Sequence, residues 1–464
     1  MVEPTAIAEI SPFLAGNFAP VHQEITSTNL KVIGKIPPEL RGSFVRNGPN
    51  PQFDPLGMYH WFDGDGMLHG VEIKDSQATY RNRYVKTAGF MKEHQAGKAL
   101  YGGILGPRDL EPELSFKNVS NTALVWHHQQ LLSLWEGGEP YLIDVPSLDT
   151  VGSQTFEGKL NTPFTAHPKV DPVTGEMMFI GYNMITPPFL HYGIVSADGK
   201  LSKLVPIELP VGVMMHDFAI TEHYSIFPNL PLTFRPEKMA KGEAAFQFES
   251  HTPSYFGILP RHGEPDSIRW FETNSCFIYH TLNAYEEGDE VILLACRMEA
   301  TSVLGMVNDP EMANKNDIPF LTRWRFNLRD NSVKEEILDD VPSEFPTLNP
   351  AYVGRKNRYG YSMTIKPDEL PLWDGIIKYD LETGNSWRYQ YGLGRYGGEA
   401  VFAPNPLGSS EDDGWLITFV YDQSTDSSEL VILAAQNLEY EPVARVLIPQ
   451  RVPYGFHGLW VPQS

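Results

Sequence analysis

Cysteine, basic charge and long apolar runs are all scarce in this chain of 464 residues. Cys276 and Cys296 are the only cysteines, too few for a disulfide framework or a cysteine metal site, which favours a reducing compartment. The net charge is −22 and no basic stripe interrupts it, so nucleic-acid binding would lack its main electrostatic contribution. No stretch reaches the roughly 18 apolar residues of a spanning helix. Nucleic-acid partners and membrane-spanning helices are therefore not expected.

Recognisable targeting features and common catalytic signatures are also missing. Residues 1–20 have neither a cationic start followed by an apolar run nor the Arg- and Ser-rich character of a transit peptide. We therefore expect a cytoplasmic protein whose membrane contact, where it has one, is peripheral and made by an apolar patch. The sequence contains no His-Glu-x-x-His pair, no phosphate-binding loop and no Gly-x-Ser-x-Gly elbow. The usual local motifs of hydrolases and nucleotide enzymes therefore do not apply.

Short β-rich runs separated by turns dominate what is present. The 39 glycines and 38 prolines are spread along the whole length, which suits many short strands better than long helices. Two hairpin patterns, at residues 324–332 and 377–384, look alike. Sheets repeated around an axis would explain how so long a chain forms one domain. One or two β-sandwiches would give the same hairpins, so the pattern alone leaves both architectures open.

Four of the 14 histidines stand in dense apolar or aromatic surroundings at widely separated places. They are His167, His216, His280 and His457. A buried imidazole needs a partner, but each of these alone is more simply explained as a core histidine. Their spacing gives no metal motif, and only an axis where distant strands converge would bring them together.

Several motifs in order resemble the carotenoid cleavage oxygenase family, over about residues 20–462. The motifs are Arg46-Asn-Gly-Pro-Asn50, Phe62-Asp-Gly-Asp-Gly66, Trp135-Glu-Gly-Gly138, Met215-His-Asp-Phe-Ala-Ile-Thr221 and Val452-Pro-Tyr-Gly-Phe-His457. This resemblance implies an all-β fold, a seven-bladed β-propeller with loops and short helices forming a cap over one face. We expect one propeller domain over residues 1–464, with residues 1–20 as an N-terminal extension.

The same resemblance implies one Fe(II) per chain, held by His167, His216, His280 and His457. Three glutamates, Glu136, Glu344 and Glu399, match the carboxylates that accept the outer N–H groups of such ligands, orienting the rings and offsetting the metal charge. Thr122 matches the residue whose methyl group limits access to one open metal position. Phe62, Trp135 and Tyr279 match side chains that line the substrate path near the metal.

The implied activity is that of a dioxygenase, in which both atoms of O2 enter two carbonyl products of a cleaved polyene double bond. Segments such as residues 256–261 and 286–293 look most like the plant branch that cuts carotenoids at the 9,10 and 9′,10′ bonds. Residues 95–101 and 134–138 instead resemble bacterial apocarotenoid 15,15′-oxygenases, which produce retinal. A stilbene-cleaving enzyme is disfavoured because that branch usually has a lysine where this chain has Trp135. Retinoid isomerisation and a non-catalytic carotenoid-binding propeller remain further alternatives.

A carotenoid is nearly insoluble in water, so its enzyme needs an apolar entrance that can touch a membrane. Two segments match the tunnel mouth and nonpolar patch of the family. The residues expected to form the patch are Leu100, Ile104, Leu105, Leu230, Leu232 and Phe234.

Overall fold

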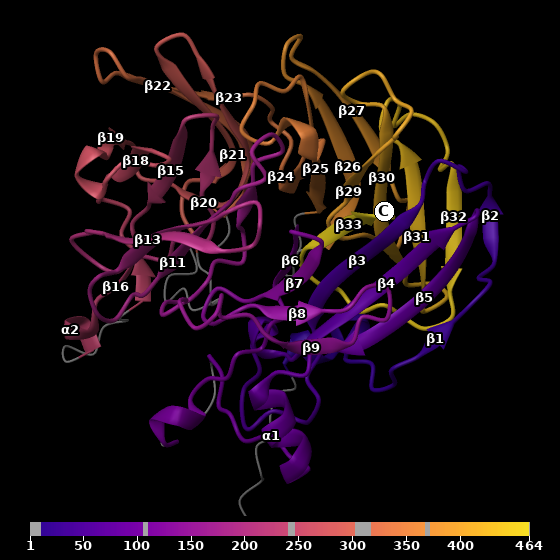
Figure 1. Cartoon of the computed structure of the whole chain (residues 1–464). Helices are drawn as coiled ribbons and strands as arrows, with labels where there is room; N and C mark the ends of the chain where they lie inside the picture. Colours follow the sequence, from indigo (N-terminus) through magenta and orange to yellow (C-terminus); the bar gives the residue numbers. More distant parts are fainter. Residues whose placement is uncertain (1–10, 105–109, 240–245, 302–316, 367–371, 464) are drawn as a thin grey trace, which may run out of the picture.

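The computed structural model describes residues 11–104, 110–239, 246–301, 317–366 and 372–463. Within these ranges, seven antiparallel sheets of four to six strands stand around a common centre, together with one two-stranded ribbon (Figure 1). This is a seven-bladed β-propeller, which confirms the expected fold. None of the helices in the described ranges has both the length and the apolar character needed to span a bilayer.

The blades follow one another along the chain. Blade 1 contains β1 (Thr26–Ser27), β3 (Gly42–Pro49), β4 (Gly66–Lys74), β5 (Gln77–Tyr84) and β33 (Gly458–Pro462). Blade 2 contains β6 (Ala123–His127), β7 (Gln130–Leu134), β8 (Tyr141–Ile143) and β9 (Thr150–Ser153). Blade 3 contains β10 (Lys169–Val170), β11 (Met177–Tyr182), β12 (Leu190–Val195) and β13 (Leu201–Ile207). Blade 4 contains β14 (Ala219–Ile220), β15 (Tyr224–Asn229), β18 (Ser254–Pro260) and β19 (Arg269–Thr273), and the ribbon of β16 (Leu232–Phe234) and β17 (Phe246–Phe248) is inserted in it.

The remaining blades have the same arrangement. Blade 5 contains β20 (Phe277–Glu287), β21 (Glu290–Met298), β22 (Phe320–Asn327) and β23 (Val333–Ile337). Blade 6 contains β24 (Ser343–Thr347), β25 (Tyr359–Lys366), β26 (Leu372–Asp380) and β27 (Asn385–Gln390). Blade 7 contains β2 (Val32–Gly34), β28 (Arg395–Tyr396), β29 (Val401–Pro404), β30 (Gly414–Asp422), β31 (Ser427–Ala434) and β32 (Ala444–Ile448). The two look-alike hairpins of the sequence are β22–β23 and β26–β27, in neighbouring blades.

Strands from both ends of the chain close the ring. The C-terminal strand β33 pairs with β3 in the first blade, and the early strand β2 pairs with β32 in the last. Residues 11–20 also pack on the propeller, where the Phe18 ring contacts those of Trp61 and Tyr454. Each end is therefore held by hydrogen bonds or ring packing to a distant part of the chain, which stabilises the closed ring.

Central strands are buried on both faces because each blade packs between two others. In β21, every residue after Glu290 is buried, whereas most of the outer strand β23 is exposed. Continuous apolar runs such as those of β21 and β31 follow from this two-sided burial. The hydrophobic core is accordingly divided into clusters that lie between blades.

Phe256 shows how adjacent blades are joined, and it gives the first prediction. Its ring is fully buried on β18 and lies 5.5 Å from the ring of Trp324 and 5.1 Å from that of Phe326, both in the next blade. Phe256→Ala is expected to lower the free energy of unfolding by about 3–5 kcal/mol, because it leaves a cavity between two rigid sheets. Denaturant unfolding measures this. Val173→Ala, at a 75% exposed residue, is the matched control, and an equal effect of both changes would contradict the packing role.

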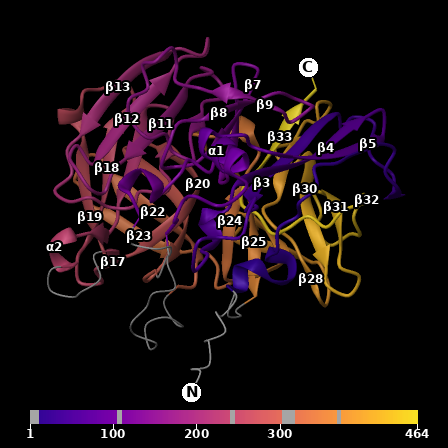
Figure 2. The same ribbon diagram turned by 90° about the horizontal axis from the view of Figure 1, so that it is seen from below.

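The short helices and loops lie outside the sheets, and α1 with the loops around it is on one side of the ring. α1 (Ala88–Ala96) is located below the sheets in Figure 1, and near the middle of the molecule when seen from below in Figure 2. The Thr87 hydroxyl accepts the Phe90 N–H at the start of the helix, and Gly97 ends it with a left-handed backbone at φ 67°. α2 (Pro236–Met239) has only four residues. The expected cap of loops and short helices is thus present.

Candidate metal centre

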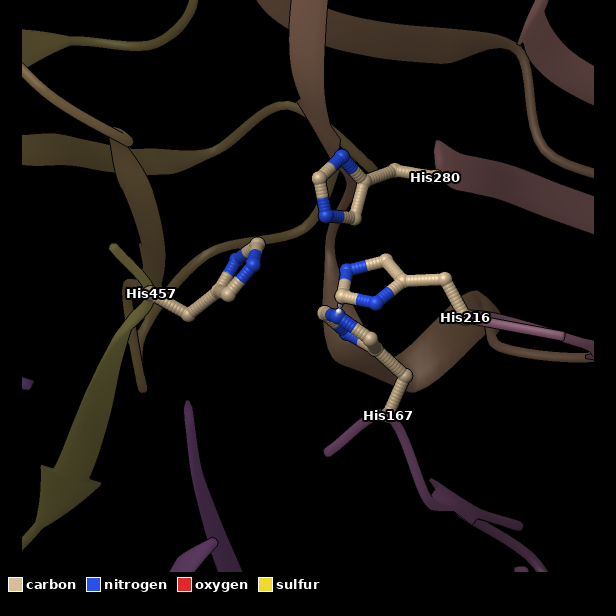
Figure 3. A group of neighbouring side chains, drawn as sticks. All are labelled: His167, His216, His280 and His457. Carbon is tan, nitrogen blue, oxygen red and sulfur yellow. Dashed lines mark hydrogen bonds between the residues drawn. The ribbon is translucent and has the colours of Figure 1, made fainter. Parts of the chain in front are cut away.

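Four histidines converge where the edge strands of four blades meet. His280 lies in β20, and His167, His216 and His457 come one to three residues before β10, β14 and β33. One ring nitrogen from each lies within 4.8 Å of the others, and Figure 3 shows the four rings pointing toward one another. The structure therefore brings together the four residues that the sequence singled out.

The propeller explains this convergence. Contacts join the edge strands of neighbouring blades, among them β14 with β20 and β29 with β33, so these strands line the centre of the ring. Residues near the start of such a strand are carried toward the axis, however distant they are in sequence. In β20 the register against β21 shifts on both sides of Thr281, beside His280. Bulges of this kind re-aim side chains next to functional sites.

Three carboxylates hold the outer nitrogens of three of the rings. The Nδ1 atom of His216 lies 2.6 Å from Glu136, that of His280 lies 2.5 Å from Glu344, and that of His457 lies 3.0 Å from Glu399. Where these carboxylates are ionised, as beside a bound cation, they only accept hydrogen bonds, so each Nδ1 is the donor and the Nε2 lone pair faces the centre. The three expected glutamates are therefore all beside the rings.

Further hydrogen bonds fix all three carboxylates. The Tyr182 hydroxyl donates to Glu136 at 2.6 Å, the Gly458 N–H donates to Glu399 at 2.6 Å, and the Phe345 N–H donates to Glu344. None of the carboxylates depends on its histidine alone for its orientation.

Burial and local charge set the protonation of the cluster. Burial and the neighbouring imidazoles hold the pKa values of His167 and His280 well below the usual range, so both rings are neutral at pH 7. Burial also opposes the charged form of His216, but the Glu136 carboxylate raises the pKa of that ring. Burial raises the pKa of Glu344 to about 8. Positive charge brought into the centre would favour the ionised form of this carboxyl.

The donor set fits a first-row divalent metal. Imidazole nitrogens suit iron, zinc, copper and nickel, and the Nε2 atom of His280 is buried without a hydrogen-bond partner in the protein. A buried polar atom without a partner is costly, and a metal ion at the centre of the four rings would satisfy it. The geometry thus supports a metal site and leaves the metal's identity open.

The other expected site residues lie around these ligands. Tyr279 places its ring edge-to-face against His216 at 5.7 Å, and Phe62 lies 5.6 Å from Phe456, the residue before His457. Trp135 precedes Glu136, and its ring covers Gly137, where an added Cβ would lie 2.4 Å from the indole. The carbonyl of Thr122 accepts the His457 N–H at 3.2 Å. All four are therefore close to a ligand or to a carboxylate that holds one.

Two residues beside the centre were missed by the sequence analysis. Phe345 lies 5.2 Å from the ring of His280 and 4.9 Å from that of His457, with φ at 51°. A bulky residue rarely adopts this left-handed backbone, and such strain gathers at functional sites. Tyr182 was missed because a tyrosine in a β-rich run resembles any core aromatic. The Glu-Phe-Pro motif around Phe345 carried no signal of its backbone conformation.

The expected apolar patch needs correction. Leu230 and Leu232 are 2% exposed and belong to the core cluster between blades 4 and 5, so the prediction that they form a surface patch is wrong. Leu232 begins β16 and pairs with Phe248 of β17, and both leucines pack in this cluster together with Phe256 and Phe277. Leu100, Ile104 and Phe234 are half-buried, and Leu105 lies outside the described residues.

Comparison with known proteins finds relatives of this chain both in sequence and in fold. The family model described as retinal pigment epithelial membrane protein matches residues 18–462. The carotenoid 9,10(9′,10′)-cleavage dioxygenase 1 of Pisum sativum is 43% identical, over 97% of this chain and 90% of its own. A lignostilbene dioxygenase of Pseudomonas brassicacearum superposes with a TM-score of 0.89 at 30% identity, over 98% of this chain and 99% of that one. Cobalt-substituted Synechocystis ACO superposes with a TM-score of 0.85 at 29% identity, over 96% and 97% of the two chains.

Proposed function

The chain belongs to the carotenoid cleavage oxygenase family, that of the retinal pigment epithelial membrane protein, and we propose that it is a non-haem Fe(II) dioxygenase acting on a carotenoid. The proposed reaction adds both atoms of O2 across a polyene double bond and yields two carbonyl products. The preferred bonds are 9,10 and 9′,10′, because relatives named for that cleavage share 41–44% identity with nearly the whole chain.

The observation that carries this proposal is the cluster of four histidines with three outer carboxylates. The four imidazoles would hold the ion, and with six-fold coordination they would leave two positions for other ligands, unlike a closed structural site. Fe(II) in this donor set would supply the one-electron chemistry toward O2 that no protein side chain provides. The protein's part is to hold the ligands, position the alkene and keep bulk water away.

The residues around the four histidines have different proposed roles. Glu136, Glu344 and Glu399 fix the orientation of three rings and supply negative charge near a dication. Thr122 is proposed to narrow one open metal position with its methyl group. Phe62, Trp135 and Tyr279 are proposed to provide flat apolar walls that hold a rigid polyene in one register. A wall residue should then affect substrate use without affecting metal content.

Trp135→Ala tests whether a wall residue affects substrate use without affecting metal content. Iron content is expected to stay at the wild-type level, while kcat/KM for the carotenoid falls by about tenfold, because one wall that positions the alkene is removed. Trp126→Ala, at a half-buried tryptophan in the same blade, is the control. Loss of iron in the Trp135 variant, or an equal loss of activity in the Trp126 variant, would contradict the proposed role.

Product analysis decides which bond is cut. Iron-loaded protein is incubated with detergent-dispersed β-carotene and, separately, with β-apo-8′-carotenal, and the products are identified by mass spectrometry. A C13 ketone and a C14 dialdehyde from β-carotene would support cleavage at 9,10 and 9′,10′. Retinal formed from the apocarotenal, with β-carotene untouched, would instead identify a 15,15′-oxygenase.

A peripheral membrane contact is proposed near α1. Met91 in α1 is 38% exposed and Phe116 is 55% exposed. The segments that carry them lie side by side, because Lys117, next to Phe116, pairs with Glu93 of α1, and Glu93 also accepts the Leu100 N–H at 2.8 Å. Together with half-buried Leu100 and Ile104, these side chains would form an apolar surface suited to a bilayer that holds the substrate.

Vesicle binding tests this contact. Replacing Met91 and Phe116 together by serine is expected to weaken binding to uncharged phosphatidylcholine vesicles about tenfold or more, because two large apolar groups no longer enter the lipid. Activity on detergent-dispersed substrate should remain unchanged. Leu393→Ser, at a fully exposed residue between blades 6 and 7, is the control. Undiminished vesicle binding by the double variant would rule this patch out.

A further inference from the structure

One buried carboxylate that no part of the proposed function uses lies directly beside the metal centre. Asp217 follows His216, and its side chain is only 2% exposed. It accepts three hydrogen bonds and makes one ion pair, so each of its two oxygens has two partners. Oδ2 accepts the N–H and the hydroxyl of Thr281, each at 2.8 Å. Oδ1 accepts the Phe218 N–H at 2.7 Å and pairs with the Lys169 ammonium at 2.7 Å.

The partners of Asp217 are notable for their positions in the chain. Thr281 follows His280, and Lys169 comes two residues after His167. A single carboxylate therefore links the chain segments beside three of the four converging histidines, which belong to blades 3, 4 and 5. Edge strands β14 and β20 contact each other, but β10 contributes only two residues to its sheet. Strand pairing alone therefore gives the segment after His167 little support.

Asp217 and its partners Lys169 and Thr281 line a cavity beside the histidines. It has a volume of about 180 Å³, and its walls include His167, Lys169, Asp217, His280 and Thr281. His457 and Glu399 also line it. Three of the histidines and the Asp217 carboxylate thus line one cavity, and Asp217 itself is buried, where hydrogen bonds to charged groups are stronger than in water. The contacts of Asp217 therefore lie beside the segments that carry the ligands.

Lys169 explains why this carboxylate would not act as a fifth ligand. Its ammonium is 19% exposed and neutralises Asp217. Each oxygen of Asp217 already has two partners, from three hydrogen bonds and this ion pair, so neither oxygen is free to bind a metal ion. Asp217 is in this respect unlike Glu136, Glu344 and Glu399, which each bond to an imidazole of the cluster.

We propose that Asp217 is a positioning residue that sets the spacing of His167, His216 and His280 and thereby the affinity and geometry of the metal site. This inference rests on the proposed function only in that the four histidines bind a divalent metal. Asp217 acts through the backbone beside the ligands and does not touch the metal, the oxygen or the polyene. Its loss therefore changes how the ion is held before any turnover takes place.

Metal binding by the full-length apo-protein tests this directly, with Co²⁺ alone as the probe. Asp217→Asn keeps the size of the side chain but places an amide N–H₂ opposite either the Thr281 donors or the Lys169 ammonium. The dissociation constant for Co²⁺, measured by titration of its d–d absorption, is expected to rise about tenfold. The shape of the absorption spectrum should change as well, because the ligand geometry differs. Thr281→Val, which removes one of the three hydrogen bonds that Asp217 accepts, should raise the constant about threefold.

Asp380→Asn is the matched control for general destabilisation. Asp380 is 2% exposed in blade 6 and accepts four hydrogen bonds, two from Arg358 and two from the backbone N–H groups of Glu382 and Thr383. Its substitution should lower thermal stability and leave both the Co²⁺ affinity and the spectrum at wild-type values. A purely structural role for Asp217 would give the same result for the two variants.

The outcomes separate this inference from the proposed function. Unchanged affinity and spectrum in Asp217→Asn, with tight binding by the wild type, would overturn the positioning role and leave the dioxygenase proposal standing. Failure of the wild type itself to bind Co²⁺ would overturn both. If Asp217→Asn does not fold, Thr281→Val decides, and wild-type affinity and spectrum in that variant would refute the proposal.

Discussion

Replacing His280 by alanine is expected to abolish carotenoid cleavage, with activity below about one thousandth of wild type, and to remove the bound iron. Three imidazoles would remain, and Glu344 would lose the ring N–H that it accepts at 2.5 Å. Burial raises the pKa of that carboxyl to about 8, so without a cation beside it the group is largely protonated near neutral pH and offsets no metal charge. The loss therefore combines a missing ligand with a missing negative charge.

The iron content of the variant is measured by metal analysis, and its activity is measured by product formation. His127→Ala is the matched control, because His127 is also buried but bonds to the Gly175 carbonyl at 2.9 Å, away from the cluster. That variant should keep its iron and its activity. Wild-type iron content in His280→Ala would contradict the assignment of His280 as a ligand.

Replacing Glu344 by glutamine should lower both the affinity for iron and the rate of cleavage by about 10- to 100-fold. Glutamine keeps an oxygen that can accept the His280 N–H, but it carries no charge and adds an N–H₂ group. The buried neighbourhood of Glu344 has little water to screen or replace the lost charge, so the ligand would be held less firmly and the ion bound less strongly. Because the fold does not depend on this charge, thermal stability of the metal-free protein should change little.

Glu429→Gln is the control for removing a buried carboxylate. Glu429 is 6% exposed in blade 7 and pairs with Arg395 and Arg445, so its substitution should lower stability while iron binding stays normal. The account would be contradicted if Glu344→Gln bound iron and turned over substrate at wild-type levels. It would also be contradicted if the two variants lost iron equally.

The strand-rich character of the fold could be predicted from residue patterns, but the ring could not. Hairpins such as residues 324–332 are local, since their turn residues and strand residues are neighbours in sequence. The order in which sheets pack is set by contacts between distant segments, and a β-sandwich would use the same hairpins. The closure of blade 1 by β33 and of blade 7 by β2 left no trace in composition or spacing. Only the resemblance to a family favoured the propeller.

For the candidate site, too, the sequence reveals features that depend on neighbouring residues but not those that depend on contacts between distant segments. His167, His216, His280 and His457 stood out by their apolar surroundings, but nothing in their spacing joins them, because the axis of the propeller does so. Phe345 escaped notice because its left-handed backbone depends on the bulge in β24 and not on its own preference. Asp217 stood within a motif used for recognition, yet its partners, Thr281 and Lys169, are known only from the fold.

Apolar surface was the least predictable feature. Leu230 and Leu232 are apolar enough for a membrane patch, but the core cluster between blades 4 and 5 buries them. Exposure depends on which face of a strand meets a neighbour, and a single shift of register reverses it. Met91 and Phe116 were not identified because an isolated exposed apolar residue is common on any protein surface. A cytoplasmic location and peripheral membrane contact stay predictions.

The most direct test of the central claim is the stoichiometry of oxygen uptake by the iron-loaded protein with β-carotene, measured with an oxygen electrode while the carbonyl products are quantified. The account predicts that one O2 is consumed for every two carbonyl groups formed, that metal-free protein consumes none, and that adding Fe²⁺ back restores uptake. Conversion of substrate without oxygen uptake would point to isomerisation. Tight binding of pigment without any product, in protein that holds iron, would mean that this propeller is a carrier and not an oxygenase.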